Sequence, residues 1–238
     1  MATGFLLGFW AAARRAPKDG LSADAVTGVA PWLILGALIG ARAFYVITQW
    51  EREFAGQPLM EILKVRSGLV FYGGLIGASG GTLLYAWKRQ VPLWKLADAL
   101  APSIALGHVF GRLGCLMTGC CYGRACGLPW ALHFPKDHAT AGVGVHPTQL
   151  YEASLNLLLW GFLEWFYTRK KFDGQIFGVY LISYAILRAF VESYRGDYSS
   201  YILNLLTPGQ AISVAIFVGG LALLLIRGHR VAPSAPGR

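Results

Sequence analysis

Three arginines lie within stretches of the chain that are otherwise almost wholly apolar. Arg42, Arg112 and Arg188 occur in the segments GARAFYVI, GHVFGRLGC and AILRAFVESYRGD. A cation in hydrocarbon is costly and is usually retained for function. A guanidinium also presents a planar fork that matches two phosphate oxygens at once. The three positions therefore indicate a site for an anionic group, and a lipid phosphate is the leading candidate.

Other polar residues recur at helical spacing around these arginines. Four helix faces carry such a stripe, namely Tyr184, Arg188, Glu192 and Arg195; His108, Arg112 and Cys115; Gln149, Glu152 and Asn156; and Arg42, Tyr45 and Gln49. Because lipid does not solvate polar groups, we expect the stripes to face one another. The alternative is that Arg42 and Arg195 reach toward the membrane interface and that Arg188 and Glu192 form a purely structural ion pair.

The composition is that of an integral membrane protein. Of 238 residues, 55% are hydrophobic and 14% are charged, and the mean hydropathy is +0.48. Soluble domains carry roughly 25% charged residues. The net charge of +9 does not indicate nucleic-acid binding, because the basic residues lie in short tracts between apolar segments. Alternating strands of barrel type are absent, and the first apolar run precedes its charges, the reverse of a cleavable signal peptide.

The fold class that we predict is all-α, a polytopic membrane bundle of about seven transmembrane helices. The apolar segments cover about 1–13, 26–49, 68–87, 96–118, 147–168, 174–194 and 209–226. A length of about 20 residues crosses ~30 Å of hydrocarbon as a helix. The first segment is shorter, so either the true start lies upstream of Met1, which we favour, or this helix is a partial span. We expect one transmembrane domain over residues 1–230, an external loop at 119–146 and a disordered tail at 231–238.

Lysines and arginines set the expected orientation. One alternate set of connections carries 12 of them and the other set carries 6. By the positive-inside rule the N-terminus lies outside and the C-terminus lies in the cytoplasm. The three intramembrane arginines then collect near the outer, periplasmic side of the membrane. Glycines four residues apart, at 36 and 40, at 73, 77 and 81, and at 107 and 111, predict close packing of helices.

One segment connects these patterns to a known family. The sequence GRLGC-x-x-x-G-C-C-Y-G at 111–123 resembles the signature of prolipoprotein diacylglyceryl transferase, a bacterial membrane enzyme that starts lipoprotein maturation. Further segments are similar to that family in the same order: GFLLGFWAAARRA (4–16), LGALIGARAFYVI (35–47), GLVFYGGLIGA (68–78), HPTQLYE (146–152), LRAFVESYRGD (187–197) and LTPGQAIS (206–213).

The resemblance implies transfer of the diacylglyceryl group of phosphatidylglycerol to the lipobox cysteine in the signal peptide of a preprolipoprotein. The products are a thioether and glycerol 1-phosphate, and no metal or other cofactor is implied. Arg112 and Arg188 take the family's essential arginine positions, Glu192 is the acidic partner, and Tyr72 stands at a position that is commonly histidine. We expect the substrates to contact the following residues: Arg112, Arg42, Gly73, Gly74, Gly123, Gln149, Glu152, Arg195 and His146.

The chain departs from the family pattern close to these residues. The commoner signature has asparagine at Cys115 and at Thr118, and an acid at Cys120. A tyrosine has an ordinary pKa near 10 and is a poor base at neutral pH. The candidates for another base are therefore Glu192, Glu152 and His146. Otherwise the chain is a paralogue with a changed acceptor, or a non-catalytic member that binds anionic lipid or lipoprotein.

Four cysteines form the pattern C-x4-C-C-x4-C at positions 115, 120, 121 and 126. Three interpretations remain open. One is a disulfide of Cys126 with Cys120 or Cys121, which fits an oxidising compartment. The others are free thiols and a metal site that includes His133 or His138. In the loop that follows, Trp130, His133 and Phe134 either cover a surface cavity, meet the lipobox peptide or anchor the loop at the interface.

Overall fold

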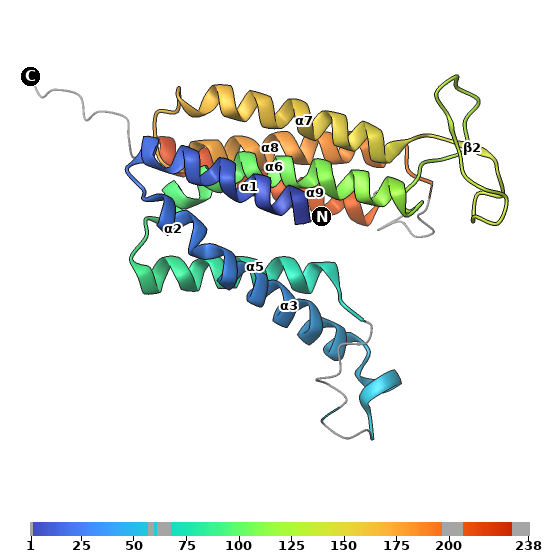
Figure 1. Cartoon of the computed structure of the whole chain (residues 1–238), viewed down its shortest axis with the longest axis horizontal. Helices are drawn as coiled ribbons and strands as arrows, with labels where there is room; N and C mark the ends of the chain where they lie inside the picture. The colour runs from blue at the N-terminus through green and yellow to red at the C-terminus, as the bar shows by residue number, and fades with distance from the viewer. Residues whose placement is uncertain (1, 57–59, 61–67, 197–206, 230–238) are drawn as a thin grey trace, which may run out of the picture.

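A computed structural model describes residues 2–56, 60, 68–196 and 207–229, which are mostly helical (Figure 1). The long helices are α1 (Ala2–Arg15), α3 (Val29–Thr48), α5 (Phe71–Arg89), α6 (Leu93–Met117), α7 (Thr148–Tyr167), α8 (Gln175–Glu192) and α9 (Pro208–His229). The short elements are η1 (Ala16–Asp19), α2 (Ala23–Thr27), η2 (Trp50–Phe54), β1 (Leu132–His133) and β2 (Gly144–Val145). Each predicted apolar segment overlaps one long helix. The predicted tail 231–238 lies outside the described residues.

Within the described residues, four stretches are long and apolar enough to cross a membrane: Ala23–Thr48, Leu93–Met117, Gln175–Glu192 and Gly209–His229. These stretches run through α2–α3, α6, α8 and α9. The prediction of a helical membrane protein is confirmed at this level.

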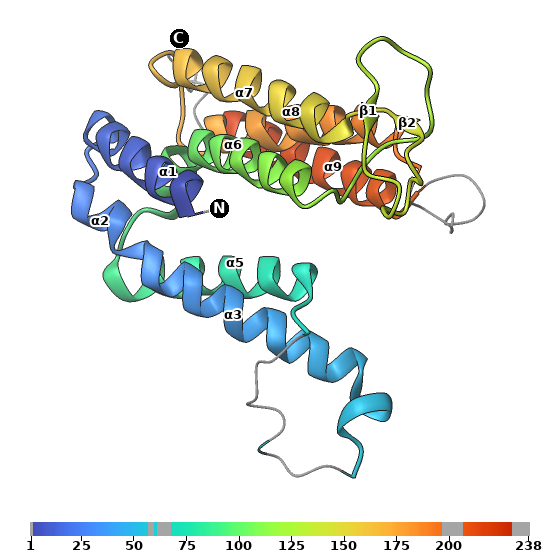
Figure 2. The ribbon, with the colours of Figure 1, turned by 45° about the vertical axis from the view of Figure 1, so that its right-hand side comes forward.

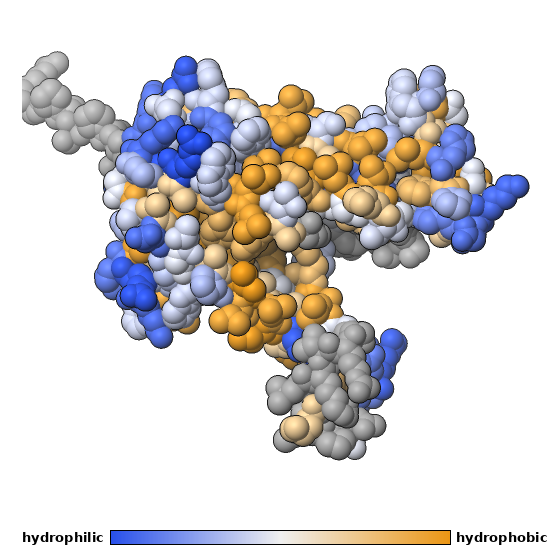
Figure 3. All heavy atoms as spheres, in the orientation of Figure 1, coloured by the Kyte–Doolittle hydropathy of each residue, from blue (hydrophilic) through white to orange (hydrophobic). Residues whose placement is uncertain are grey.

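The long helices form two groups. Helix α6 packs against α1, α7 and α8, and α9 packs against α8, so these five helices make one bundle. Helices α3 and α5 pack mainly against each other, and their pair diverges from the bundle toward the end of α3 (Figures 1 and 2). The surface is hollowed between the pair and the bundle, and apolar side chains lie on both sides of the hollow (Figure 3). An apolar opening of this kind suits lipid better than water.

The contact between α3 and α5 depends on glycine. A Cβ atom at Gly77 would overlap the carbonyl oxygen of Gly36, and one at Gly40 would overlap the carbonyl oxygen of Gly73. The helix backbones can approach this closely only without side chains. This confirms the predicted close packing at these positions. The prediction is wrong for Gly107 and Gly111, where an added Cβ would meet no other atom within 4 Å among the described residues.

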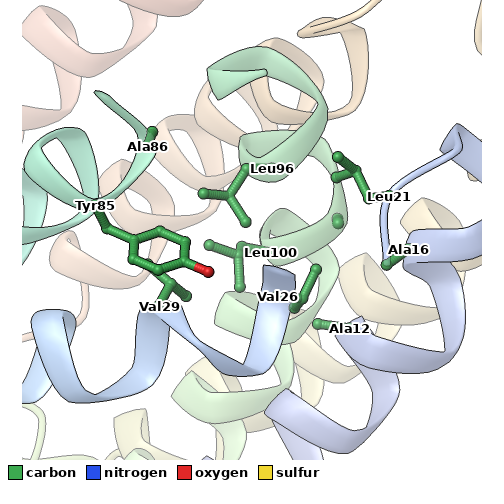
Figure 4. Packing of buried hydrophobic residues seen from close by; sticks show 10 residues of the cluster. Ala12, Ala16, Leu21, Val26, Val29, Tyr85, Ala86, Leu96 and Leu100 are labelled. Atoms are coloured by element: carbon green, nitrogen blue, oxygen red, sulfur yellow. The ribbon is translucent and has the colours of Figure 1, made fainter. Parts of the chain in front are cut away.

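The base of the α3–α5 pair is held to the bundle by a small apolar core. Val26 and Val29 are buried against Leu96 of α6 and Ala12 of α1 (Figure 4). Tyr85 of α5 joins this core, and its hydroxyl donates a hydrogen bond to the carbonyl oxygen of Ala25 at 2.9 Å. The pair is therefore anchored at one end and diverges at the other.

A buried polar network lies at the anchored end of the bundle. Asp98 is 0% exposed and accepts hydrogen bonds from the backbone N–H groups of Gly174 at 2.9 Å and Phe177 at 3.0 Å. Lys170 Nζ lies 3.0 Å from Asp98 Oδ2 and 2.6 Å from Asp19 Oδ2. Burial lowers the pKa of Lys170, but the carboxylates of Asp19 and Asp98 raise it more, so its pKa lies above the ordinary value. These ion pairs connect η1, the start of α6 and the α7–α8 connection.

Arg15 makes a second set of polar contacts at this anchored end of the bundle. The guanidinium of Arg15 donates to Glu164 of α7 and to the hydroxyl of Ser103 in α6. Its Nη2 also lies 3.0 Å from the carbonyl oxygen of Ala99. In the sequence, Arg15 and Lys170 indicate only the orientation. In the structure, Arg15 pairs with the partly exposed Glu164, and Lys170 pairs with the buried Asp98. The sequence signal that was available is Asp98, an acid inside an apolar segment.

Candidate functional site

An ion-pair network joins α6, α7 and α8 at the end of the bundle opposite the Asp98 network. Glu152 lies between two arginines, with Oε1 2.9 Å from Arg112 Nη2 and Oε2 3.1 Å from Arg188 Nη1. Arg188 Nη2 lies 2.7 Å from Glu192 Oε2. Glu152 and Glu192 are each 2% exposed. Two partly buried arginines are therefore held against two buried carboxylates.

Local spacing explains why these groups meet. Arg112 lies near the C-terminal end of α6, Arg188 lies near that of α8, and Glu152 lies in the second turn of α7. Helix α7 runs antiparallel to both, so its start lies beside their ends (Figure 1). Arg188 and Glu192 are four residues apart and share one helix face. The predicted convergence of the stripes on α6, α7 and α8 is confirmed by these ion pairs.

The four charges depend on one another. A buried ion pair is costly to break, typically by about 3–5 kcal/mol, because one charge is left without compensation. Glu152 is the common partner of Arg112 and Arg188, so its loss removes the carboxylate from Arg112 and leaves Arg188 paired with Glu192. The network thus holds two guanidinium groups against one shared carboxylate.

The start of α9 completes the surroundings of Glu192. Thr207 Oγ1 donates to Glu192 Oε1 at 3.0 Å, and a Cβ atom at Gly209 would overlap the same carboxylate. Thr207 and Gln210 exchange hydrogen bonds, with Gln210 N 3.2 Å from Thr207 Oγ1 and Thr207 N 3.1 Å from Gln210 Oε1. This is a capping box at a helix start. Thr207 and Gly209 were missed as site residues, although the T-x-x-Q pattern was a signal for a fixed helix start.

Three further polar side chains lie around the arginines. Asn156 is buried and donates to the backbone oxygen of Glu152 at 2.8 Å. The rings of His108 and Tyr184 lie 4.9 Å apart between α6 and α8. All three residues belong to the polar stripes of the sequence. Their packing fixes the rotation of the helices that carry Arg112, Glu152 and Arg188.

The segment after α6 is tied to the start of α7. Gln149 Nε2 donates to the carbonyl oxygen of Cys120 at 2.6 Å, and Thr148 Oγ1 donates to that of Cys121 at 2.7 Å. Gln149 is 1% exposed, so it acts here as a structural clamp. Gly123 forms an isolated bridge with Arg195, and a Cβ atom at Gly123 would lie 2.6 Å from His146 Cβ. Gly123 is therefore required by close chain packing.

His146 belongs to a group of aromatic side chains near the start of α7. Its ring lies 6.1 Å from that of Tyr151 and 5.2 Å from that of Tyr194. Tyr151 accepts a hydrogen bond from Trp130 Nε1 at 2.8 Å. Trp130 comes from the loop that also forms the short pair β1–β2. The loop is thereby attached to the start of α7, next to the charged network.

The other predicted site residues lie on the α3–α5 pair. Arg42 Nη1 lies 3.5 Å from the carbonyl oxygen of Gly68, and its guanidinium lies over the rings of Tyr45 and Phe54. Tyr72 is 46% exposed in the first turn of α5. Its neighbours Gly73 and Gly74 both face α3. These four predicted residues belong to the pair across the apolar hollow, whereas the ion-pair network belongs to the bundle.

All four cysteines are free thiols in the structure. His138 contacts the carbonyl oxygen of Gly119 at 2.8 Å and Thr140 Oγ1 at 3.0 Å, so both of its ring nitrogens are engaged. The predicted alternative of a metal site with His138 is therefore disfavoured. Cys115, Cys120 and Cys121 nevertheless lie together, as described below.

The comparisons with known proteins agree on one family. A family model described as prolipoprotein diacylglyceryl transferase matches residues 1–226. A phosphatidylglycerol–prolipoprotein diacylglyceryl transferase of Finegoldia magna is 37% identical over 222 residues, which cover 92% of this chain and 86% of that protein. A protein of the same name from Synechococcus elongatus is 35% identical over 240 residues, covering 96% of this chain and 82% of that protein. One from Rhodopirellula baltica is 44% identical over 150 residues, 60% of this chain and 29% of that protein.

Proposed function

This chain belongs to the prolipoprotein diacylglyceryl transferase family, and from that premise we propose that it modifies lipoprotein precursors. It transfers the diacylglyceryl group of phosphatidylglycerol to the lipobox cysteine thiol of a preprolipoprotein. The products are a thioether and glycerol 1-phosphate. The observation that carries this proposal is the buried bridge of Glu152 between Arg112 and Arg188, because the same two guanidinium groups can hold a phosphate.

The reaction follows from an exchange of anions. The phosphate of the lipid replaces the Glu152 carboxylate on Arg112 and Arg188. The freed carboxylate accepts the proton of the substrate thiol, and the thiolate attacks the glyceryl carbon that bears the phosphate. The carbon–oxygen bond breaks and its electron pair leaves with the phosphate oxygen. The arginines stabilise the charge that develops there, the usual role of fixed cations at a leaving group.

Glu192 keeps Arg188 in place during this exchange. Its ion pair with Arg188 and its hydrogen bond from Thr207 do not involve Glu152. Arg188 therefore remains compensated when the lipid is absent or has left. Glu192 is a positioning residue in this account, and Glu152 is the proton acceptor.

The lipid lies in the apolar hollow between the α3–α5 pair and the bundle. Arg42 and Tyr72 contact it from the α3–α5 pair, and Gly73 and Gly74 allow the close approach of α5 to α3 that positions them. Its headgroup points to the ion-pair network. The Tyr72 hydroxyl, at the position where the family commonly has histidine, contacts the lipid as a hydrogen-bond donor.

The preprolipoprotein meets the network from the side of the loop at residues 119–146. Gln149, His146, Gly123 and Arg195 shape that approach. Trp130 holds the loop against Tyr151 and supplies an aromatic surface for an apolar signal peptide. These assignments rest on the position of the loop at the start of α7.

Seven helices cross the bacterial inner membrane in this proposal. The N-terminus lies outside, the C-terminus lies in the cytoplasm, and the network faces the periplasm. The uneven distribution of basic residues between alternate connections supports this orientation. Residues 1–230 then form one transmembrane domain.

The experiment is complementation of a bacterial strain depleted of its own transferase. We expect the chain to restore incorporation of labelled fatty acid into a reporter lipoprotein, and we expect Arg188→Ala to abolish it at equal membrane abundance. Arg52→Ala, on the α3–α5 connection, is the control and keeps the activity. A wild-type chain that inserts normally yet restores no lipidation, or a fully active Arg188→Ala variant, contradicts the proposal.

A further inference from the structure

Three cysteine sulfur atoms gather at the C-terminal end of α6. The Sγ atoms of Cys115, Cys120 and Cys121 all lie within 4.8 Å of one another. Four Zn–S bonds of about 2.3 Å at tetrahedral angles place sulfur atoms about 3.8 Å apart. The observed separations therefore need to shorten by no more than about an ångström. A disulfide uses two of these atoms and does not explain the third.

The end of α6 brings two of the thiols together. Cys120 N donates to the carbonyl oxygen of Cys115 at 3.0 Å, Gly119 N donates to that of Leu116 at 3.2 Å, and Gly119 has φ +71°. This pair of hydrogen bonds with a left-handed glycine is a Schellman motif. In that motif the first and last residues place their side chains in contact. Here these residues are Cys115 and Cys120.

The third thiol is held by a different set of contacts. Cys121 has φ +61°, a left-handed conformation that is strained for a non-glycine residue. The hydrogen bonds from Thr148 to Cys121 and from Gln149 to Cys120 keep the backbone in this conformation. Both donors are buried in α7. The three thiols are thus preorganised by two helices before any ligand binds.

The surroundings suit a cation and leave a path to it. Cys120 is exposed and the other two thiols are partly exposed, so an ion can enter from solvent. Gln149 Oε1 is buried and has no hydrogen-bond partner among the described residues, so it can accept a hydrogen bond from a metal-bound water. Arg112 lies three residues before Cys115 on the same face of α6 and can compensate the extra negative charge of thiolates.

We propose that Cys115, Cys120 and Cys121 bind one soft d10 cation, Zn²⁺ or Cu⁺, through three thiolates. Thiolate ligands select these ions over hard cations. Each thiol that coordinates loses its proton to solvent. Three thiolates with Zn²⁺ carry a net charge of −1, and with Cu⁺ they carry −2. Either group stands beside Arg112.

The charge of the occupied site has a consequence that rests on the proposed function. An anionic metal–thiolate group attracts the guanidinium of Arg112 and competes with a lipid phosphate for it. We expect bound metal to lower the rate of diacylglyceryl transfer by at least about fivefold, the lower end of typical coupling between two sites. Removal of the ion with a chelator restores the rate.

The test measures metal uptake directly. The full-length protein, reduced with a non-thiol reductant and stripped with chelator, is dialysed against Zn²⁺ or against Cu⁺, and bound metal is counted by elemental analysis. We expect one ion per chain with one or both metals. Cys115→Ser, Cys120→Ser or Cys121→Ser removes a direct ligand and lowers the affinity at least as much as loss of an outer-shell partner does, about tenfold or more. Cys126→Ser is the matched control and binds like the wild type, because Cys126 lies outside the cluster.

Thiol alkylation read by peptide mass gives a second measurement that needs no variant. Metal is expected to protect Cys115, Cys120 and Cys121 and to leave Cys126 reactive. Uptake of neither ion, equal loss of uptake in Cys126→Ser, or protection of Cys126 alone overturns the proposal. Because no turnover is required, the metal site and the transferase activity are tested independently. Metal binding without transfer contradicts only the proposed function, and transfer without metal binding contradicts only this site.

Discussion

Glu152 contacts both of the arginines that we assign to the phosphate, and this double contact can be tested at the level of one residue. We expect Glu152→Gln to lower the transfer rate at least about a hundredfold, because the proton acceptor is lost. The same change removes a competing anion from two guanidinium groups. The dissociation constant for phosphatidylglycerol should therefore fall severalfold, as measured with a labelled lipid in detergent.

Glu164→Gln provides the matched control for this variant. The exchange is the same, it lies on the same helix, and Glu164 also pairs with an arginine, Arg15, at the other end of the bundle. We expect it to lower the unfolding temperature without changing the dissociation constant for the lipid. If both variants leave lipid binding unchanged, the phosphate does not share the arginines with Glu152.

Individual residues differ in how far the sequence predicted them. Arg112, Glu152 and Arg188 were accessible, because helical spacing groups each with polar neighbours and lipid forces such faces together. Their pairing pattern was not accessible, since the sequence does not fix which carboxylate lies between two arginines. The contact of Gly209 with Glu192 was missed for the same reason, as it depends on the approach of α9.

The pair of helices α3 and α5 tests the account at the level of the element. Replacing glycine by alanine inside a helix normally stabilises it by roughly 0.5–1 kcal/mol. We expect Gly80→Ala to follow this rule, because a Cβ atom there meets nothing within 4 Å. Gly77→Ala should instead lower the unfolding temperature, since its Cβ overlaps the carbonyl oxygen of Gly36. Thermal unfolding in detergent measures both.

A shift of the same sign and size in both variants contradicts the close approach of α3 and α5. Binding of phosphatidylglycerol to the two variants gives a second measurement. The hollow beside this pair is the proposed position of the lipid, so Gly77→Ala should also weaken lipid binding. Gly80→Ala should leave it unchanged.

Helix positions were predictable because apolar runs end at charged or turn-forming residues. The runs at 26–49 and 68–87 correspond to α3 and α5, with ends that differ by at most three residues. The divergence of this pair from the bundle was not predictable. Both helices are apolar on most faces, so periodicity does not indicate which face meets protein and which meets lipid.

At the scale of the whole molecule, the two ends of the bundle carry different polar networks. The one around Lys170 makes stability depend on pH. The pKa of Lys170 is raised above its ordinary value of 10.5 by Asp19 and Asp98, against the effect of burial. Its stabilising contribution is therefore complete below that value and is lost as the pH rises through the raised pKa.

We expect the unfolding temperature of Lys170→Met to be lower than that of wild type at pH 8, and the difference to shrink at pH above about 10.5. Lys171→Met is the control, because the neighbouring Lys171 is exposed and should follow the wild type throughout. A difference that stays constant with pH excludes the Lys170 ion pairs as its source.

The proposed orientation makes a prediction about one native thiol. Cys126 lies in the loop that we place in the periplasm. In a variant that combines Cys115→Ser, Cys120→Ser and Cys121→Ser, we expect a membrane-impermeant maleimide to label Cys126 in intact spheroplasts. Labelling only after membrane disruption reverses the orientation and places the Arg112–Glu152–Arg188 network at the cytoplasmic surface.

The central claim is that Arg112 and Arg188 hold the phosphate of phosphatidylglycerol during diacylglyceryl transfer. The most direct measurement mixes purified chain, phosphatidylglycerol labelled in its phosphate and a lipobox peptide, and quantifies both products by mass and by label. The account predicts equal amounts of thioether-linked diacylglyceryl peptide and labelled glycerol phosphate. It also predicts that Arg112→Ala and Arg188→Ala each lower both products by at least about a hundredfold. No product from well-folded wild type, or undiminished product from either variant, contradicts the account.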